Sequence, residues 1–110
     1  IVFNIQNQSN VIIRNGTISN VNQNAIFINN SNNVLLQNLV IENVTGGDAI
    51  LIQNSTNITI DNVTILDNSQ NAFSFINDSQ VSLTNSTVII NNVAVTNQIG
   101  VNVVNTDNVY

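Results

Sequence analysis

The chain has 110 residues, with one arginine, no lysine, six acidic residues and a formal net charge of −5. One cation cannot form the basic surface that nucleic acids and anionic membranes attract, and no apolar run approaches the roughly 20 residues of a membrane-spanning helix, so we expect neither a nucleic-acid partner nor membrane insertion. The sequence contains no cysteine and no histidine. Thiolate and imidazole ligands are therefore missing, and the acidic residues Glu42, Asp61, Asp67 and Asp78 stand at different positions of the repeat described below, which does not favour a cluster of carboxylates, so we expect no metal site and no cofactor.

Five segments of the chain resemble one another without internal gaps. They read "VFNIQNQSNV" from Val2, "AIFINNSNNV" from Ala25, "AILIQNSTNI" from Ala49, "AFSFINDSQV" from Ala72 and "GVNVVNTDNV" from Gly100. Successive starts lie 23, 24, 23 and 28 residues apart. A period of this length indicates a repeat architecture, in which each unit buries its apolar side chains against its neighbours.

Within each repeat, apolar and polar residues alternate, which is typical of β-strands. The first strand contributes two inward columns, namely Phe3, Ile26, Ile50, Phe73 and Val101, and then Ile5, Ile28, Ile52, Phe75 and Val103. The second strand contributes Val11, Val34, Ile58, Val81 and Val109, and then Ile13, Leu36, Ile60 and Leu83. The third contributes Ile18, Ile41, Ile65 and Val88. This pattern predicts three strands per coil and coils stacked about 4.8 Å apart in parallel sheets.

The last interval between repeats is five residues longer than the one before it. The additional residues fall within Ser86–Ile99, a segment that is itself rich in β-branched residues. The segment is therefore either a broadened bend or an additional pairing segment, and the sequence leaves its register open.

Asparagine is the most frequent residue, and it recurs at the two bends that the strand pattern predicts. One column consists of Asn7, Asn30, Asn54, Asn77 and Asn105, and the other of Asn15, Asn38, Asn62 and Asn85. An asparagine side chain both donates and accepts hydrogen bonds and tolerates the left-handed conformation of sharp bends. We therefore expect two ladders of hydrogen-bonded asparagines along the stack. Many of these asparagines lie in N-x-[ST] sequences, but we expect that their hydrogen bonds prevent glycosylation in the folded chain. Asn29, Asn43 and Asn57 lie outside these columns, which leaves them open as acceptors.

These repeats, with segments such as "NVTI" at residues 62–65, resemble the right-handed parallel β-helix of the pectate-lyase-like superfamily. The resemblance covers nearly the whole chain. It implies an all-β, single-stranded parallel solenoid of about five coils with three parallel sheets. Residues 1–110 would then form a single domain that is either a fragment of a longer solenoid or a unit that stacks on its own copies.

The segment nearest to a catalytic motif is "TGGDAILI", residues 45–52. It resembles the GDDxIxI segment of polygalacturonase-type glycoside hydrolases, with Asp48 in place of the second aspartate and Gly47 in place of the first. Inverting hydrolysis requires two carboxylates, so half of the motif is insufficient. The neighbouring repeats carry Asn24 and Asn71 where this one carries Asp48, which favours a turn residue. Asp48 is the single weak catalytic candidate, and we predict no complete catalytic site.

The outward positions of the strands include several apolar residues. We predict that these positions form a face that binds a protein partner or a carbohydrate. The face consists of Phe27, Leu51, Asn29, Gln53, Ile12 and Leu35. Exposed apolar patches often mark contact with a partner, and amide side chains can bind sugar hydroxyl groups. Protein packing is the favoured use of this face.

Taken together, these features predict a non-catalytic structural or adhesive module of an extracellular, cell-surface or virion assembly. Its expected partners are adjacent coils or further copies of the same chain, in a homo-oligomer or filament, with carbohydrate as an additional ligand. Two alternatives remain open at the level of the sequence. One is a fragment of a polysaccharide lyase or glycoside hydrolase, and the other is a carbohydrate-binding module.

Overall fold

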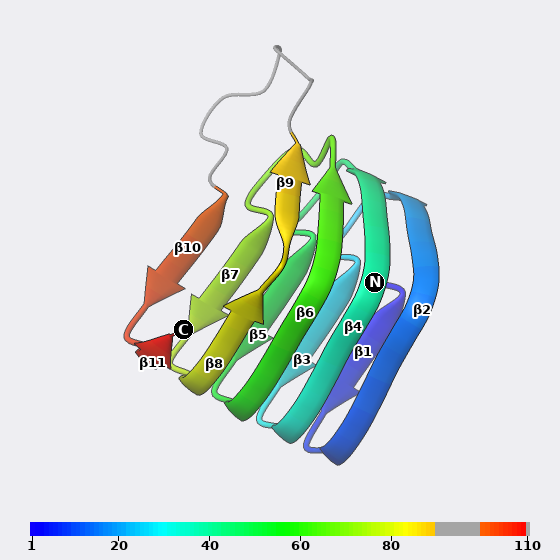
Figure 1. Ribbon diagram of the computed structural model, residues 1–110. Helices are drawn as coiled ribbons and strands as arrows, with labels where there is room; N and C mark the ends of the chain where they lie inside the picture. Colours follow the sequence, from blue (N-terminus) through cyan, green and yellow to red (C-terminus); the bar gives the residue numbers. More distant parts are fainter. Residues whose placement is uncertain (90–99, 110) are drawn as a thin grey trace.

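The structure, a computed structural model, describes residues 1–89 and 100–109 and consists of β-strands joined by tight bends (Figure 1). The strands are β1 (Phe3–Gln6), β2 (Ser9–Val21), β3 (Ile26–Asn29), β4 (Asn32–Val44), β5 (Ile50–Gln53), β6 (Thr56–Leu66), β7 (Phe73–Ile76), β8 (Ser79–Thr84), β9 (Thr87–Ile89), β10 (Val101–Val104) and β11 (Asp107–Val109). The described residues contain no helix that is long and apolar enough to cross a membrane.

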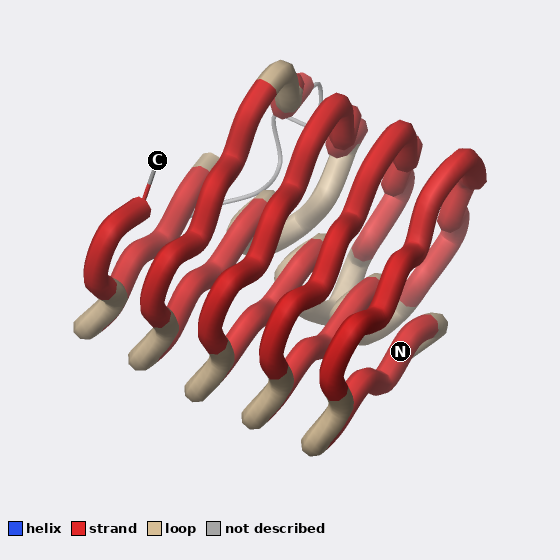
Figure 2. The backbone as a smooth tube through the Cα atoms, turned by 60° about the horizontal axis from the view of Figure 1, so that its bottom comes forward, coloured by secondary structure: helices blue, strands red, loops and turns tan. Residues whose placement is uncertain are grey.

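Within residues 1–89 and 100–109, all strand pairs are parallel, and the strands form two sheets. The first sheet has the order β1-β3-β5-β7-β10, and the second has the order β11-β8-β6-β4-β2 with β9 beside β6. Each coil passes from one sheet to the other, so the chain advances along a solenoid of four turns between β1 and β10 (Figures 1 and 2). The predicted fold class is confirmed.

The number of sheets differs from the three that the sequence predicts. In β2, β4 and β6 the second and third predicted strands are continuous, and they separate only in the fourth coil, as β8 and β9. The bend between them is made by one residue in the left-handed conformation, Asn15, Asn38 or Asn62. Because a single residue interrupts the pairing, hydrogen bonding resumes at once and the two predicted sheets become one bent sheet (Figure 2).

The register of the strands reproduces the predicted columns. Phe3 pairs with Ile26, Ile26 with Ile50, Ile50 with Phe73, and Phe73 with Val101. The offset between β7 and β10 contains the five additional residues of the last interval. Thr87–Ile89 of that interval form β9, and its residues 90–99 lie outside the described part of the chain.

The core is a stack of inward side chains between the two sheets. Its largest fully buried members are Phe73, Phe75, Ile26, Ile28, Leu36, Ile41, Ile50, Ile52, Ile58, Ile60, Ile65 and Val34. The inward residues of the outermost coils are more exposed, because each has a neighbouring coil on one side only. Phe3 is 39% exposed at one end and Val103 is 46% exposed at the other.

Candidate functional site

The bends of the solenoid carry all seventeen non-glycine residues with positive φ among the described residues, and fifteen of these are asparagines. Their φ angles lie between 48° and 61°, in the left-handed region that asparagine tolerates better than most residues. These residues form four columns along the stack rather than the two that the sequence analysis identifies. The two additional columns contain Asn10, Asn33, Asn57, Gln80 and Asn108, and Asn20, Asn43 and Asp67.

The two predicted ladders are present, with two changes of partner. In the first ladder, Asn30 Nδ2 donates to Asn7 Oδ1 at 2.6 Å. Asn77 Nδ2 donates to Asn54 Oδ1 at 3.4 Å, whereas Asn54 Nδ2 donates to Asn29 Oδ1 at 3.0 Å rather than to Asn30. Asn105 occupies its predicted bend with a φ of 48°.

In the second ladder, Asn38 Nδ2 donates to Asn15 Oδ1 at 3.1 Å, and Asn62 Nδ2 donates to Asn38 Oδ1 at 2.9 Å. Asn85 Nδ2 donates to Asp61 Oδ1 at 2.9 Å in place of Asn62. All ladder asparagines of these two columns are exposed, so the ladders run along the outer corners of the solenoid.

Two further ladders change the assignment of Asn43 and Asn57. Asn43 Nδ2 donates to Asn20 Oδ1 at 2.7 Å. Asn33 Nδ2 donates to Asn10 Oδ1 at 2.7 Å, and Asn57 Nδ2 donates to Asn33 Oδ1 at 3.4 Å. The expectation that Asn43 and Asn57 lie outside the ladders is therefore wrong. The period of 23 or 24 residues that separates these asparagines was a visible signal for both columns.

A column that is buried at Ser31, Ser55 and Asp78 and half-buried at Thr106 stands beside the first ladder and pairs the backbone at that bend. It consists of Ser31, Ser55, Asp78 and Thr106, one residue after each asparagine. The side-chain oxygens of Ser31, Ser55, Asp78 and Thr106 each accept the backbone N–H of the equivalent residue in the preceding coil, at 2.7–3.2 Å. We call these four residues the bend column. Buried backbone N–H groups need such partners, and the exposed asparagines do not supply them.

Asp78 is the one carboxylate of the bend column and is 3% exposed. Ser31, Ser55 and Thr106 each donate their hydroxyl to the backbone carbonyl two residues earlier, at 2.7–3.1 Å. The Asp78 carboxylate instead accepts the backbone N–H groups of Ser55 and Ile76, at 2.7 and 3.0 Å. Burial raises the pKa of Asp78 to about 6, and these two hydrogen bonds only partly offset that effect.

Asp48, the weak catalytic candidate, lies at a different bend of the coil, in one column with Asn24 and Asn71. The backbone N–H of Asp48 donates to Asn24 Oδ1 at 2.8 Å, and Asp48 Oδ1 accepts the backbone N–H of Asn71 at 3.0 Å. Asp48 is also buried. Its carboxylate therefore links two coils at a turn, as the residues at the equivalent positions suggest.

Gly47 stands where the hydrolase motif has its first aspartate. A Cβ atom at Gly47 would overlap Asn24 Oδ1 and would lie 2.7 Å from the Asn24 backbone nitrogen. The preceding coil therefore leaves no space for a carboxylate at this position. Among the described residues, no group of three or more acidic side chains could hold a metal ion.

Asp61 lies on the outer face of the second sheet and accepts three side-chain hydrogen bonds. The donors are Asn85 at 2.9 Å, Gln37 at 3.2 Å and Thr84 at 2.9 Å. These bonds, that of Asn85 first, lower the pKa of Asp61 below its usual value because they favour the charged form. Asp61 is thus an ionised surface group within an amide and hydroxyl network.

The predicted partner face is divided between the two sheets. Phe27 and Leu51 pair on β3 and β5, and Ile12 and Leu35 pair on β2 and β4. Asn29 and Gln53 pair on the same strands as Phe27 and Leu51, and all four of these side chains are half-buried. Ile12 is 60% exposed.

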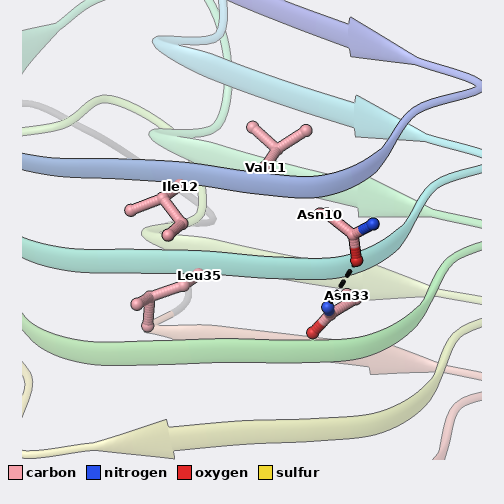
Figure 3. Close-up of a pocket in the computed structure, with 5 residues that line it drawn as sticks. All are labelled: Asn10, Val11, Ile12, Asn33 and Leu35. Atoms are coloured by element: carbon pink, nitrogen blue, oxygen red, sulfur yellow. Dashed lines mark hydrogen bonds between the residues drawn. The ribbon is translucent and has the colours of Figure 1, made fainter.

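Ile12 and Leu35 line a hollow of ≈ 220 Å³ in the second sheet (Figure 3). Its lining residues are Asn10, Val11, Ile12, Asn33 and Leu35. The hydrogen bond between Asn33 Nδ2 and Asn10 Oδ1 lies at one edge of it (Figure 3). The hollow contains no charged side chain, so it has no group for acid–base chemistry.

Comparison with known proteins agrees with this architecture. The chain matches the family model described as a right handed beta helix region over residues 2–110. No curated protein and no solved structure matches it. Because the match includes every coil described above, the chain belongs to the right-handed β-helix family.

Proposed function

We propose that this chain is a non-catalytic structural module, a rigid β-helical rod in an extracellular, cell-surface or virion assembly. The observation that carries the proposal is the role of the polar side chains at the bends, which hydrogen-bond one coil to the next. Even the weak catalytic candidate, Asp48, accepts a backbone N–H from the next coil. A rod of this kind presents surface groups at fixed spacing and resists bending, because every coil is bonded to its neighbours.

The surface charge fits the same role. Charged residues make up 6% of the sequence, and sixteen of the seventeen left-handed bend residues that the structure describes carry neutral amides. A solenoid with amide-covered corners tolerates changes of salt better than one that depends on ion pairs, since exposed ion pairs are screened by salt. Such tolerance suits a module that works outside the cell.

The competing proposal is a fragment of a polysaccharide-active enzyme, and an activity assay separates the two. Purified chain is incubated with a panel of acidic polysaccharides, and new reducing ends and unsaturated products are measured. We expect neither product above the level of a heat-denatured control. Asp48→Asn keeps a side-chain oxygen that can accept the Asn71 N–H, so we expect this variant to keep the fold. Turnover by the native chain that is abolished in Asp48→Asn would overturn the structural proposal.

A further inference from the structure

Nine asparagines of the chain stand in N-x-[ST] sequences, the acceptor pattern for N-linked glycans. They are Asn7, Asn15, Asn29, Asn43, Asn54, Asn57, Asn62, Asn77 and Asn85. Eight of the nine are bend residues with a positive φ. The exception is Asn29, which is the last residue of the extended strand β3. The fold therefore treats one of the nine acceptor sequences differently from the rest.

The ladders engage the amide nitrogens of the other acceptors in coils two to four. Each of these asparagines donates from Nδ2 to a side-chain oxygen of the preceding coil, and they are Asn43, Asn54, Asn57, Asn62, Asn77 and Asn85. A glycan is attached to this same nitrogen, and it is bulky. It would stand against a coil only about 4.8 Å away and break the ladder.

Asn29 lies between two neighbouring coils, and its amide nitrogen is still available. It pairs with Gln6 of β1 on one side and with Gln53 of β5 on the other. Its Oδ1 accepts from Asn54 Nδ2 at 3.0 Å, whereas no described residue accepts a hydrogen bond from its own Nδ2. Because coils lie on both sides of Asn29, this availability belongs to the interior of the stack.

An apolar surface lies beside Asn29 on the same face of the sheet. Ile26 and Ile28 of β3 are fully buried in the core, so Phe27 and Asn29 point outward together. The two residues are about 7 Å apart along the strand. Phe27 pairs with Leu51 of β5, and both side chains are half-buried. A pyranose ring has a face of C–H groups, which gains free energy when it covers such a surface.

We propose that Asn29 is an N-glycosylation site and that the first sugar of its glycan packs on Phe27 and Leu51. The sugar donor is a glycan linked to a polyisoprenoid pyrophosphate. Asn29 Nδ2 forms a bond to the anomeric carbon, the bond from that carbon to the phosphate oxygen breaks, and Nδ2 releases one proton to the medium. Asn29 Oδ1 is unchanged, so it continues to accept from Asn54. The inference rests on the extracellular location in the proposed function.

Folding selects among the glycosylated chains. The transferase acts on the chain during secretion, before the coils have closed, and all nine acceptor sequences are then accessible. A chain with a sugar on Asn62 loses the bond to Asn38 when its coils close. A chain with a sugar on Asn29 loses no hydrogen bond that the structure describes. Soluble, folded chains are therefore those in which Asn29 carries the glycan and the ladder donors do not.

The first experiment maps glycans on the 110-residue chain expressed in a glycosylating host, with the soluble secreted fraction and the cell-retained fraction kept apart. A glycan-releasing amidase in isotopically labelled water converts each modified asparagine to labelled aspartate, and a sample without amidase corrects for spontaneous deamidation. Cleavage after phenylalanine and leucine isolates residues 28–35, which contain Asn29 and no other acceptor sequence. We expect label at Asn29 in the soluble fraction, and label at Asn62 only in the retained fraction.

Two variants test the assignment to this acceptor sequence. Asn29→Gln keeps an amide but removes the acceptor, and we expect the soluble chain to lose the mass of the glycan. Ser31→Thr keeps the acceptor sequence and the hydroxyl of the bend column, as Thr106 does in the last coil, and we expect the glycan to remain. Circular dichroism checks that both variants keep their strands.

The second experiment tests the packing of the first sugar. Thermal unfolding is compared before and after amidase treatment, for the native chain and for Phe27→Ser. Serine suits this position, because Ser74 stands in the same column two coils later. We expect the glycan to raise the midpoint of the native chain by a few degrees and to raise that of Phe27→Ser less. An equal rise in both chains would overturn the packing on Phe27.

Two results would overturn the site itself. They are a soluble chain without a glycan on Asn29, and a soluble, folded chain with a glycan on Asn62. A soluble chain that is unmodified at Asn29 and inactive on polysaccharides would remove the modification and leave the structural role. Cleavage of polysaccharides would instead remove the structural role, whatever the state of Asn29.

Discussion

Gly47 packs directly against Asn24 of the preceding coil. A Cβ atom at Gly47 would overlap the Asn24 side-chain oxygen and would lie 2.7 Å from the Asn24 backbone nitrogen. The same oxygen accepts the backbone N–H of Asp48 at 2.8 Å. This contact explains both the glycine in the sequence and the absence of the first aspartate of the hydrolase motif.

Replacing Gly47 by alanine should destabilise the fold. The methyl group must displace the backbone of the preceding coil, and overpacking of this kind costs about 1–3 kcal/mol in the free energy of unfolding. Urea denaturation followed by circular dichroism measures the change. Gly16→Ala is the matched control because a Cβ there meets nothing within 4 Å. A Gly47→Ala chain as stable as Gly16→Ala would contradict the close contact.

Two substitutions at Asn38 should separate the ladder from the backbone conformation. Asn38 has a φ of 53°, donates to Asn15 and accepts from Asn62. Asn38→Gly loses the exposed hydrogen bonds but suits the left-handed conformation, and we expect a loss of about 1 kcal/mol. Asn38→Ala loses the bonds and adds strain, so we expect a loss of about 2–3 kcal/mol. Equal losses for glycine and alanine in urea denaturation would show that the conformation contributes nothing.

Asp78 should make the fold more stable in mild acid. Because its pKa is raised to about 6 in the folded chain, folding favours the protonated form. This contribution is fully present below the ordinary aspartate pKa of about 4 and is lost as the pH rises through about 6, with a size of about 1–3 kcal/mol.

The comparison that tests this uses Asp78→Ser, which places in coil four the hydroxyl that Ser31 and Ser55 supply in the coils before it. We expect denaturation midpoints of the native chain to rise between pH 7 and pH 4.5 relative to those of Asp78→Ser. Asp61→Asn serves as the control of opposite sign, since the lowered pKa of Asp61 gives a contribution that is lost as the pH falls. A native chain and an Asp78→Ser variant with parallel pH profiles would refute the role of Asp78.

Glycosylation should be absent from those ladder asparagines whose Nδ2 atoms donate to another coil in the folded chain. The Nδ2 atoms of Asn43, Asn57 and Asn62 each donate to the preceding coil, so a glycan on these atoms would break the ladder. We expect mass spectrometry of soluble chain secreted from a glycosylating host to find Asn62 unmodified. Asn29 provides the internal comparison, because it accepts from Asn54 and no described residue accepts from its Nδ2. A glycan on Asn62 in folded material would contradict the ladder.

The spacing of the repeats was sufficient to predict the strands, their register and the inward columns. Ile28 and Ile52 could be aligned from sequence because a parallel stack repeats one pattern of apolar side chains at each coil. The two ladders through Asn54 and Asn62 were predictable for the same reason. The ladders through Asn43 and Asn57 follow the same period, but these asparagines do not stand at either of the two bends that the alternation of apolar residues predicts.

Other features depend on contacts between coils that the repeat does not specify. Asn54 bonds to Asn29 and Asn85 to Asp61, because a side chain takes the nearest acceptor and not the equivalent one. The two predicted sheets merge because the bend at Asn38 interrupts the strand pairing by a single residue.

By itself, the sequence determined the coil, because an apolar column repeated at a fixed period can be buried only by stacking equivalent strands. The tertiary structure decided how the polar groups are used. It placed the asparagines on the exposed corners and paired the backbone N–H groups of one bend with the side-chain oxygens of Ser31, Ser55, Asp78 and Thr106. It also made the ladder asparagines donate from the later coil to the earlier one, as Asn30 does to Asn7. Apolar burial depends on the pattern of residues alone, whereas a hydrogen bond depends on the distance and angle between two particular atoms, and only the folded coils fix these.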